Sequence, residues 1–493
     1  MIDQQDAQHV PGGASRRGGI TCLFAGMLDK RISLLLFLLV FFCCSYFVQI
    51  DSWNQTSRMA LIMSVVHRHQ LNIDPYEQST GDKALYNDHY YSDKAIGTAV
   101  LGVPVYAAYS ALRGFEDYSV LHNSYPVTVM VVALPSAILS VLLYQLLRMM
   151  GSSRAWALLL CLFYSFGTLA FPFSTMLFGH QVAAAFAFAA FYALVIARLH
   201  RSSGWLLLLA GTLAGLAVLT EYQVLLITIF LFLYAATFVR PKRQLGLYIL
   251  GGAPWAALLL VYNWYTFSSP FTFAYSYVDN AQFEAMHTGL FGITWPQWSS
   301  FIEITIGQRG LLMQSVFLWL LPLGVWLMSR TVQWRRECVL CVGVGLAFLI
   351  WNSAYYLPFG GMTPGARFLV PSLPFLIVPL SFVAQLRRTD SLLTRWILLF
   401  TGICSMGLYF LICVTNPLVP EKMGCCLIPN PLRDYWLPRF ADEHLALNLG
   451  MLVFGLHGIE SLAPLAMVFV VTLTAFVLLI RSHLPAGEKH PAS

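Results

Sequence analysis

The chain has too few charged residues to cover a surface exposed to water. Only 11% of its 493 residues are Asp, Glu, Lys or Arg, whereas a soluble domain carries roughly 25%. Hydrophobic residues make up 58% of the chain, and apolar runs of about 20 residues, the length that crosses a hydrocarbon core, recur throughout. The short alternating strands of a membrane barrel are lacking. We therefore predict an all-α, polytopic transmembrane helical bundle.

Motifs typical of several other classes of protein are also missing. No GxSxG, GxGxxG or GxxxxGK[ST] motif stands in a suitable context, which argues against nucleophilic hydrolases and nucleotide-binding enzymes. Of ten cysteines, Cys338 and Cys341 have CxxC spacing, but no second pair completes a zinc site. We expect no cofactor and leave open whether a divalent metal is needed.

The apolar runs predict about twelve membrane spans. They lie at 32–49, 124–148, 155–173, 181–199, 204–220, 223–239, 245–265, 311–329, 338–357, 368–385, 396–414 and 463–480. With the N-terminus inside, the cytoplasmic segments hold 19 of the 29 basic residues and six of the 23 acids, as the positive-inside rule requires. We expect one transmembrane domain, 32–481, with cytoplasmic tails at 1–31 and 482–493. The membrane would be the plasma membrane, which is the inner membrane of a bacterium.

The longest polar insertion near the start of the chain is the first outer loop, 50–123. The apolar run 95–113 within it would invert every later loop if it crossed the membrane, so we predict an interfacial helix there. The spacing of apolar residues over 54–70 predicts a second, amphipathic helix, with Arg58 on its water-facing side. Residues 71–93 interleave four tyrosines with acids and bases, a composition suited to a sugar or a lipid head group. A merely solvated loop is the alternative.

One acid lies near the boundary of two predicted spans. Glu221, in the segment LTEYQ, stands between the fifth and sixth spans at the outer side. It either faces a cavity formed by the outer loops or is a turn residue that faces water. Deeper ionisable residues, which would indicate an ion or proton relay, are nearly absent from the spans.

Several segments resemble, in the right order, those of the C-type (GT-C) polytopic membrane glycosyltransferases. The likeness is to bacterial relatives of the aminoarabinose and protein mannosyl transferases. The segments are SR at 57–58, LNID at 71–74, YYSDKAIGTAVLGVPVY at 90–106, FSTMLFGHQVAAAF at 173–186, GLAVLTEYQ at 215–223, MHTGLFGI at 286–293 and YYLPFGGMTPGARFLVPSLPFL at 355–376. The resemblance implies transfer of a monosaccharide from a polyprenyl-phosphate-linked donor to a glycan, lipid or protein acceptor. The lipid bilayer is a further expected partner and nucleic acid is not.

The implied chemistry needs cations for the departing phosphate. Lysine, arginine or histidine can stabilise the negative charge that develops on that phosphate. By resemblance, Lys94 is the best donor-phosphate ligand, with Arg58, His180 and Arg367 as candidates to join it. For Arg367 the alternative is an anchor at the membrane interface. The residues expected to contact the substrate are Asp93, Tyr91 and Glu221.

The same chemistry needs a carboxylate that takes the proton of the acceptor hydroxyl. Relatives often carry an acidic pair shortly before the arginine that matches Arg58, but this chain has Asn54 and Gln55 there. The base is therefore open among three acids, Asp51, Asp74 and Asp82. This departure also leaves room for a non-catalytic relative.

Two other functions compete with glycosyl transfer. A membrane transporter or flippase of a lipid-linked sugar would need charged or broken helices at mid-membrane and usually an internal repeat, and neither is evident. A structural membrane scaffold would not require a loop rich in Tyr and Asp opposite a GGMTPGAR segment.

Overall fold

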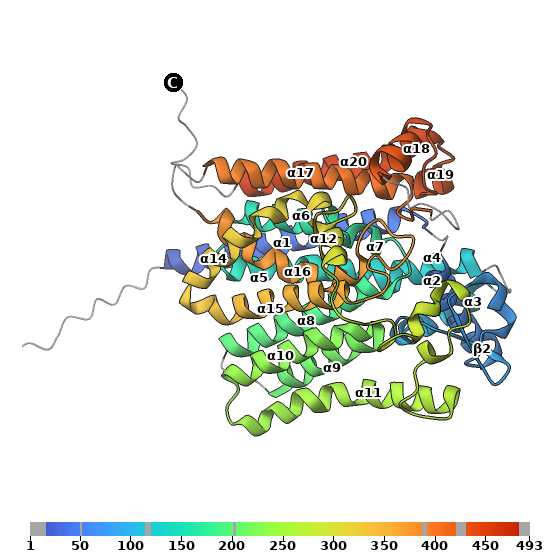
Figure 1. The fold of residues 1–493 in the computed structure, drawn as a ribbon. Helices are drawn as coiled ribbons and strands as arrows, with labels where there is room; N and C mark the ends of the chain where they lie inside the picture. Colours follow the sequence, from blue (N-terminus) through green and yellow to red (C-terminus); the bar gives the residue numbers. More distant parts are fainter. Residues whose placement is uncertain are drawn as a thin grey trace, which may run out of the picture.

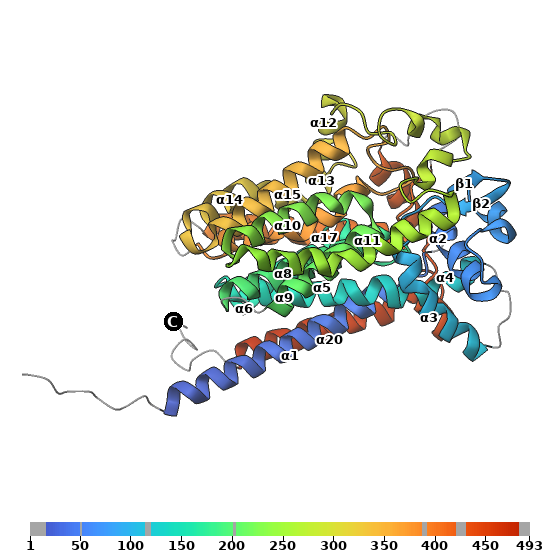
Figure 2. The same cartoon turned by 90° about the horizontal axis from the view of Figure 1, so that it is seen from below.

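The computed structural model describes residues 16–49, 52–113, 120–200, 204–386, 392–420 and 430–482. In these ranges the chain forms a bundle of long, roughly parallel helices (Figures 1 and 2). The main helices of the bundle are α1 (Arg16–Tyr46), α5 (Leu134–Met149), α6 (Arg154–Phe166), α8 (Gly179–Leu199), α9 (Gly204–Thr220), α10 (Leu225–Phe238), α11 (Leu245–Phe267), α14 (Leu321–Arg330), α15 (Arg335–Ser353), α16 (Leu373–Ala384), α17 (Leu392–Thr415) and α20 (Ala463–Arg481).

Further helices and two strands connect these helices. They are α2 (Trp53–Met63), β1 (Lys83–Tyr86), β2 (His89–Ser92), α3 (Gly97–Arg113), α4 (Val120–Thr128), α7 (Ala170–Ser174), α12 (Trp298–Ile306), α13 (Leu311–Gln314), α18 (Leu437–Ala441) and α19 (Leu449–Phe454). The elements from α2 to α3 gather at one end of the bundle, which we call the outer end, and α1 begins at the other (Figure 2).

The predicted all-α membrane fold is confirmed. Within the described ranges seven helical stretches are long and apolar enough to cross a membrane: His122–Met149, Gly179–Leu199, Lys242–Phe267, Val332–Ser353, Arg367–Ala384, Leu392–Thr415 and Gly458–Arg481. Three shorter apolar helices accompany them: Arg154–Phe166, Gly204–Thr220 and Tyr222–Phe238. Each of the twelve predicted spans overlaps a helix.

Two predicted spans are not straight helices. The span 155–173 is interrupted, because α6 ends at Phe166 and α7 begins at Ala170. The span 311–329 belongs to a pair of helices, Trp298–Gln314 and Val316–Arg330, that is bent by 103°. Hydropathy reports only how apolar a segment is, so such breaks are invisible to it.

The helices differ in how much of their surface is covered. In Arg367–Ala384, 94% of the 18-residue apolar stretch is buried inside the protein. In Lys242–Phe267 and Gly458–Arg481 only 11% of the corresponding stretch is buried. Helix α16 therefore lies in the centre, and α11 and α20 present apolar residues outward, as expected of helices that face lipid. Glycine brings α9 and α11 into close contact, because a Cβ on Gly211 would lie 1.9 Å from the backbone oxygen of Tyr248.

A two-stranded hairpin in the first outer loop was not predicted from the turn-rich sequence. Strands β1 and β2 pair antiparallel, and their turn residues Asn87 and Asp88 have φ angles of 49° and 62°. Two successive left-handed residues are the signature of the tight turn that matches strand twist. In this register Lys83 pairs with Ser92. Asp82 directly precedes β1 and Asp93 directly follows β2, so this pairing brings the two residues close to each other.

Helix α2 lies where the amphipathic segment was predicted, but its environment is different. Asn54 to Met63 are all buried, and Arg58 is only 2% exposed. The prediction that Arg58 faces water is therefore wrong. The helix is wrapped by α3, α4 and the hairpin segment, so both its faces are covered.

Candidate active site

The outer end of the bundle contains a cavity of about 650 Å³. Its walls come from seven parts of the chain: the start of α2, the two ends of the hairpin, the start of α8, the residue after α9, and two segments around 275–286 and 355–368. Seven residues singled out from the sequence line it: Arg58, Asp82, Asp93, Lys94, His180, Glu221 and Arg367. Segments far apart in sequence thus bring most of the candidate residues together.

Arg58 is held by side chains and backbone on all sides. Its Nε donates to Asn54 Oδ1 (3.0 Å), and its Nη1 donates to Ala95 O (3.1 Å) and Thr98 Oγ1 (3.0 Å). Its Nη2 forms an ion pair with Glu221 Oε1 at 2.7 Å. Because these contacts use most of its donors, Arg58 joins α2, α3 and α9 and has little capacity left for a ligand.

The carboxylate of Glu221 is shared between two basic groups. Its Oε1 accepts from Arg58 and, at 2.9 Å, from Nδ1 of His180. Burial alone would raise the pKa of Glu221, but the nearby His180 and Arg58 outweigh burial and bring the pKa down to about 2. Glu221 is 5% exposed, so the alternative of a water-facing turn residue is wrong. Gly179 makes this contact feasible, because a Cβ there would lie 2.3 Å from Glu221 Oε1.

His180 presents its second nitrogen without a partner. With Nδ1 bonded to Glu221, Nε2 is buried and has no hydrogen-bond partner within the described residues. The ring is stacked between Phe173 and Phe368, with ring centres 5.7 and 5.4 Å away. Packing fixes the orientation of the ring, so Nε2 is a pre-oriented polar group at the cavity wall.

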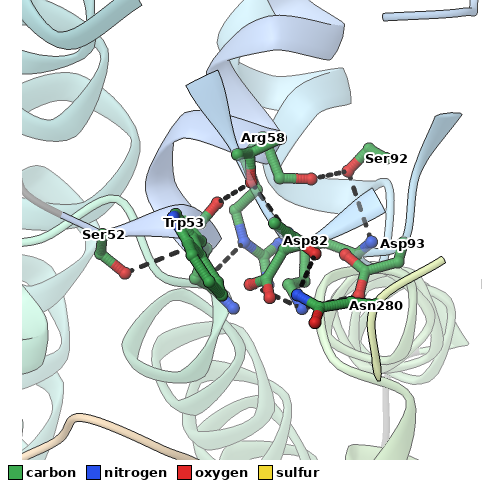
Figure 3. A network of polar contacts seen from close by, with 12 residues as sticks. Ser52, Trp53, Arg58, Asp82, Ser92, Asp93 and Asn280 are labelled. Carbon is green, nitrogen blue, oxygen red and sulfur yellow. Dashed lines mark hydrogen bonds and ion pairs between the residues drawn. The ribbon is translucent and has the colours of Figure 1, made fainter. Parts of the chain in front are cut away.

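Lys94 lies between two carboxylates. Its Nζ is 2.9 Å from Asp82 Oδ2 and 3.0 Å from Asp93 Oδ2, and the hairpin brings the two acids together beside Arg58 (Figure 3). The other oxygen of Asp93, Oδ1, is buried and has no hydrogen-bond partner in the described part of the chain. Burial raises the pKa of Asp93, Lys94 opposes that rise, and the Asp82 carboxylate adds to it, so the pKa is about 6.

Arg367 differs from the other two cations at the cavity. Its guanidinium lies over the rings of Phe368 and Phe178, 5.0 and 5.6 Å from their centres. Its Nε is buried without a partner, and no ion pair involves Arg367 among the described residues. Gly360 leaves room for the side chain, because a Cβ there would lie 2.3 Å from Arg367 Nε. Arg367 is therefore the cavity cation most available to an anion.

Aromatic side chains complete the cavity wall. Trp53, Tyr275, Phe283, Tyr355 and Tyr356 all line it. Flat apolar faces next to polar groups suit a sugar ring. None of these five was singled out from the sequence. The only signal was that two of them, Tyr355 and Tyr356, begin one of the segments that carry the family resemblance.

Two predicted site residues in the described part of the chain, Asp74 and Tyr91, do not line the cavity. Asp74 accepts from His89 Nδ1 and from the backbone N–H of Tyr90, both at 2.7 Å, outside the cavity lining. Tyr91 packs against Phe267, with ring centres 5.6 Å apart. Asp51 lies outside the described residues.

The two amides Asn54 and Gln55, which stand where the resemblance predicted an acidic pair, have structural contacts. The side-chain oxygen of Asn54 accepts from Arg58, and the side-chain oxygen of Gln55 accepts from the backbone N–H of Leu177 at 2.8 Å.

As for metals, no three His, Cys, Asp or Glu side chains gather as ligands within the ranges that the structure describes.

This arrangement, a helical bundle with a charged cavity at its outer end, shares its fold with two solved structures, an oligosaccharyltransferase and ArnT. The apo oligosaccharyltransferase of Archaeoglobus fulgidus matches with a TM-score of 0.50 and 13% identity over 83% of this chain and 59% of that chain. Apo ArnT from Cupriavidus metallidurans matches with a TM-score of 0.50 and 15% identity over 94% of this chain and 76% of that chain. The chain thus spans about three fifths of the archaeal protein. No protein-family model and no curated protein matches the sequence.

Proposed function

We propose that the protein transfers a monosaccharide, with inversion, from a polyprenyl-phosphate-linked donor to a glycan, lipid or protein acceptor outside the cytoplasm. The observation that carries the proposal is a single cavity that joins an unpaired Arg367, a pre-oriented His180 and a lysine held by two carboxylates. Cations for a phosphate and carboxylates for a proton are what this transfer requires. The shared fold with an oligosaccharyltransferase and with ArnT supports the same type of reaction.

In this proposal Arg367 is the principal ligand of the donor phosphate. Its planar fork of donors can bind two phosphate oxygens at once. With Nδ1 bonded to Glu221, His180 can donate from Nε2 to the same anion when its ring is protonated. Lys94 also lines the cavity, but its charge is balanced by the two carboxylates that hold it. Arg58, already engaged, contributes positive charge and holds Glu221 in place for His180.

The sugar would lie against the aromatic wall, with its anomeric carbon between phosphate and acceptor. As the bond to phosphate breaks, positive charge develops on the sugar and negative charge on the phosphate. The acceptor attacks from the side opposite the phosphate, which inverts the anomeric carbon, and a carboxylate on that side takes the acceptor's proton. Asp82 lines the cavity and remains a candidate for this role, Asp51 remains a prediction, and Asp74 is not among the residues that line the cavity.

We further propose twelve membrane crossings, which add α1, the three shorter helices and the bent pair to the seven long apolar stretches. Both termini would be cytoplasmic, and α3 would lie in the outer interface of the plasma or bacterial inner membrane. The positive-inside count supports this orientation. So does the arrangement of α2 and α3 at the end of the bundle opposite the start of α1 (Figure 2).

The experiment uses the purified full-length protein in lipid nanodiscs. A panel of undecaprenyl-phosphate-linked sugars is offered together with envelope extract as the acceptor source, and release of undecaprenyl phosphate is measured by mass spectrometry. We expect release from at least one donor, and much less with Arg367→Ala. If no donor in the panel is cleaved, the proposal fails. Movement of an intact lipid-linked sugar across liposomes without cleavage would favour the flippase alternative.

A further inference from the structure

Among the described residues three acids line the cavity, and they differ in how their oxygens are used. Glu221 is the least suited to accept a proton, because Arg58 and His180 both donate to its Oε1 at hydrogen-bond distance. A carboxylate held by two basic groups gives up that stabilisation when it is protonated. Glu221 is therefore a positioning residue for Arg58 and His180.

Asp82 and Asp93 share Lys94 but not the same surroundings. Asp82 is 6% exposed and Asp93 is 2% exposed. Each offers one oxygen, Oδ2, to Lys94 Nζ. For Asp93 the second oxygen is a buried acceptor without any donor within the described residues, and Asp82 has no such atom. A buried polar atom with no partner is costly unless a ligand or water supplies one.

We infer that Asp93 is the general base, with its Oδ1 as the atom that accepts the proton of the acceptor hydroxyl. The inference rests on the proposed function and deepens it, since Asp93 was expected only to contact the substrate. A substrate hydroxyl donating to Oδ1 would satisfy the acceptor that the protein leaves open. Lys94 holds the other oxygen and so fixes the carboxylate's orientation.

The electrostatics of the pair support the same assignment. Two carboxylates around one ammonium group cannot both be fully compensated, so the more buried one binds a proton more readily. A pKa of about 6 for Asp93 leaves it mostly ionised at neutral pH yet basic enough to take a proton. Glu221, with a pKa of about 2, lacks that basicity.

The step balances without a further reactant. The acceptor oxygen forms a bond to the anomeric carbon while its proton passes to Asp93 Oδ1. The bond between that carbon and the phosphate oxygen breaks, and its electron pair stays on the phosphate. Asp93 then returns the proton to solvent or to the released phosphate, which restores the carboxylate.

The test compares Asp93→Asn with Asp82→Asn in the nanodisc assay. It uses the panel donor that the wild-type protein cleaves fastest. General-base catalysis contributes about 10²–10⁴-fold, so we expect Asp93→Asn to lower kcat by about 100-fold or more. The wild-type pH profile should fall on its acidic side near pH 6, and that fall should be absent from the residual activity of Asp93→Asn. Binding of undecaprenyl phosphate by Asp93→Asn should be unchanged or tighter, because a negative charge is removed.

Other outcomes would overturn the assignment. If Asp93→Asn keeps more than a tenth of the wild-type kcat, or keeps the acidic fall at the same pH, Asp93 is not the base. If Asp82→Asn abolishes that fall, Asp82 is the base instead, and this result stands even where Asp93→Asn does not fold. Failure of the wild-type protein to cleave any donor would instead refute the proposed function, so the two failures are distinguishable.

Discussion

Replacement of Arg367 by alanine tests the proposed phosphate site most directly. Among the described residues, this guanidinium has no ion pair, and it rests on the rings of Phe178 and Phe368. Its removal should therefore take away ligand binding and these two ring contacts, without breaking an ion pair of the fold. The equivalent change at Arg58 would break an internal network instead.

The magnitude follows from the bonds that Arg367 can make. Two charge-assisted hydrogen bonds to one phosphate are each worth about 1.5–3 kcal/mol, and each 1.4 kcal/mol is a factor of about ten in affinity. We expect Arg367→Ala to weaken binding of undecaprenyl phosphate by about 100-fold. Arg367→Lys keeps the charge but loses the fork, so about tenfold is expected.

The assay is titration of the nanodisc-embedded protein with undecaprenyl phosphate, with undecaprenol as the ligand that lacks the phosphate. Arg433→Ala is the matched control, because Arg433 is exposed and pairs with Asp434 away from the cavity. Equal binding of undecaprenyl phosphate by Arg367→Ala and wild type would refute the reasoning. So would an equal loss of affinity for undecaprenol, since that loss would lie in the lipid tail.

Three further predictions concern the groups that position this site. Glu221→Ala leaves Arg58 buried without its carboxylate, which should lower the free energy of unfolding by about 3–5 kcal/mol. Glu77 pairs with Lys83 at a more exposed position, so Glu77→Ala should lower it by only about 0–1 kcal/mol. Melting curves in detergent that shift equally for the two variants would contradict this. Although burial opposes it, ion pairing lowers the pKa of Glu221 from 4.5 to about 2, so its stabilisation is complete above pH 4.5 and is lost as the pH falls from there toward 2. The melting temperatures of wild type and Glu221→Gln should therefore converge in that interval, and a constant difference would refute the linkage. Gly360→Ala places a Cβ 2.3 Å from Arg367 Nε at a φ of 75°, so it should weaken undecaprenyl phosphate binding in the same direction as Arg367→Ala; unchanged binding would show that Arg367 has room to move.

The amino-acid sequence by itself determined the membrane fold. The bilayer selects segments by length and apolarity, which are local properties, so composition and hydropathy were enough to predict a helical bundle. The order of segments along the chain led, by resemblance, to the prediction that Lys94, His180 and Arg367 belong to one site, and all three line the cavity. The loop 71–93 supplies Asp82 and Asp93 to the cavity, but none of its four tyrosines lines it, and its hairpin was missed.

Only the tertiary structure decided what each charged group can do. The partner of Arg58 is Glu221, 163 residues away, and no local pattern indicates such a pair. That contact turns a predicted water-facing arginine into a buried one. Likewise, the hairpin register puts Asp82 and Asp93 on either side of Lys94. Whether an ionisable group is available for chemistry depends on which partners surround it, and those partners come together only when the chain folds.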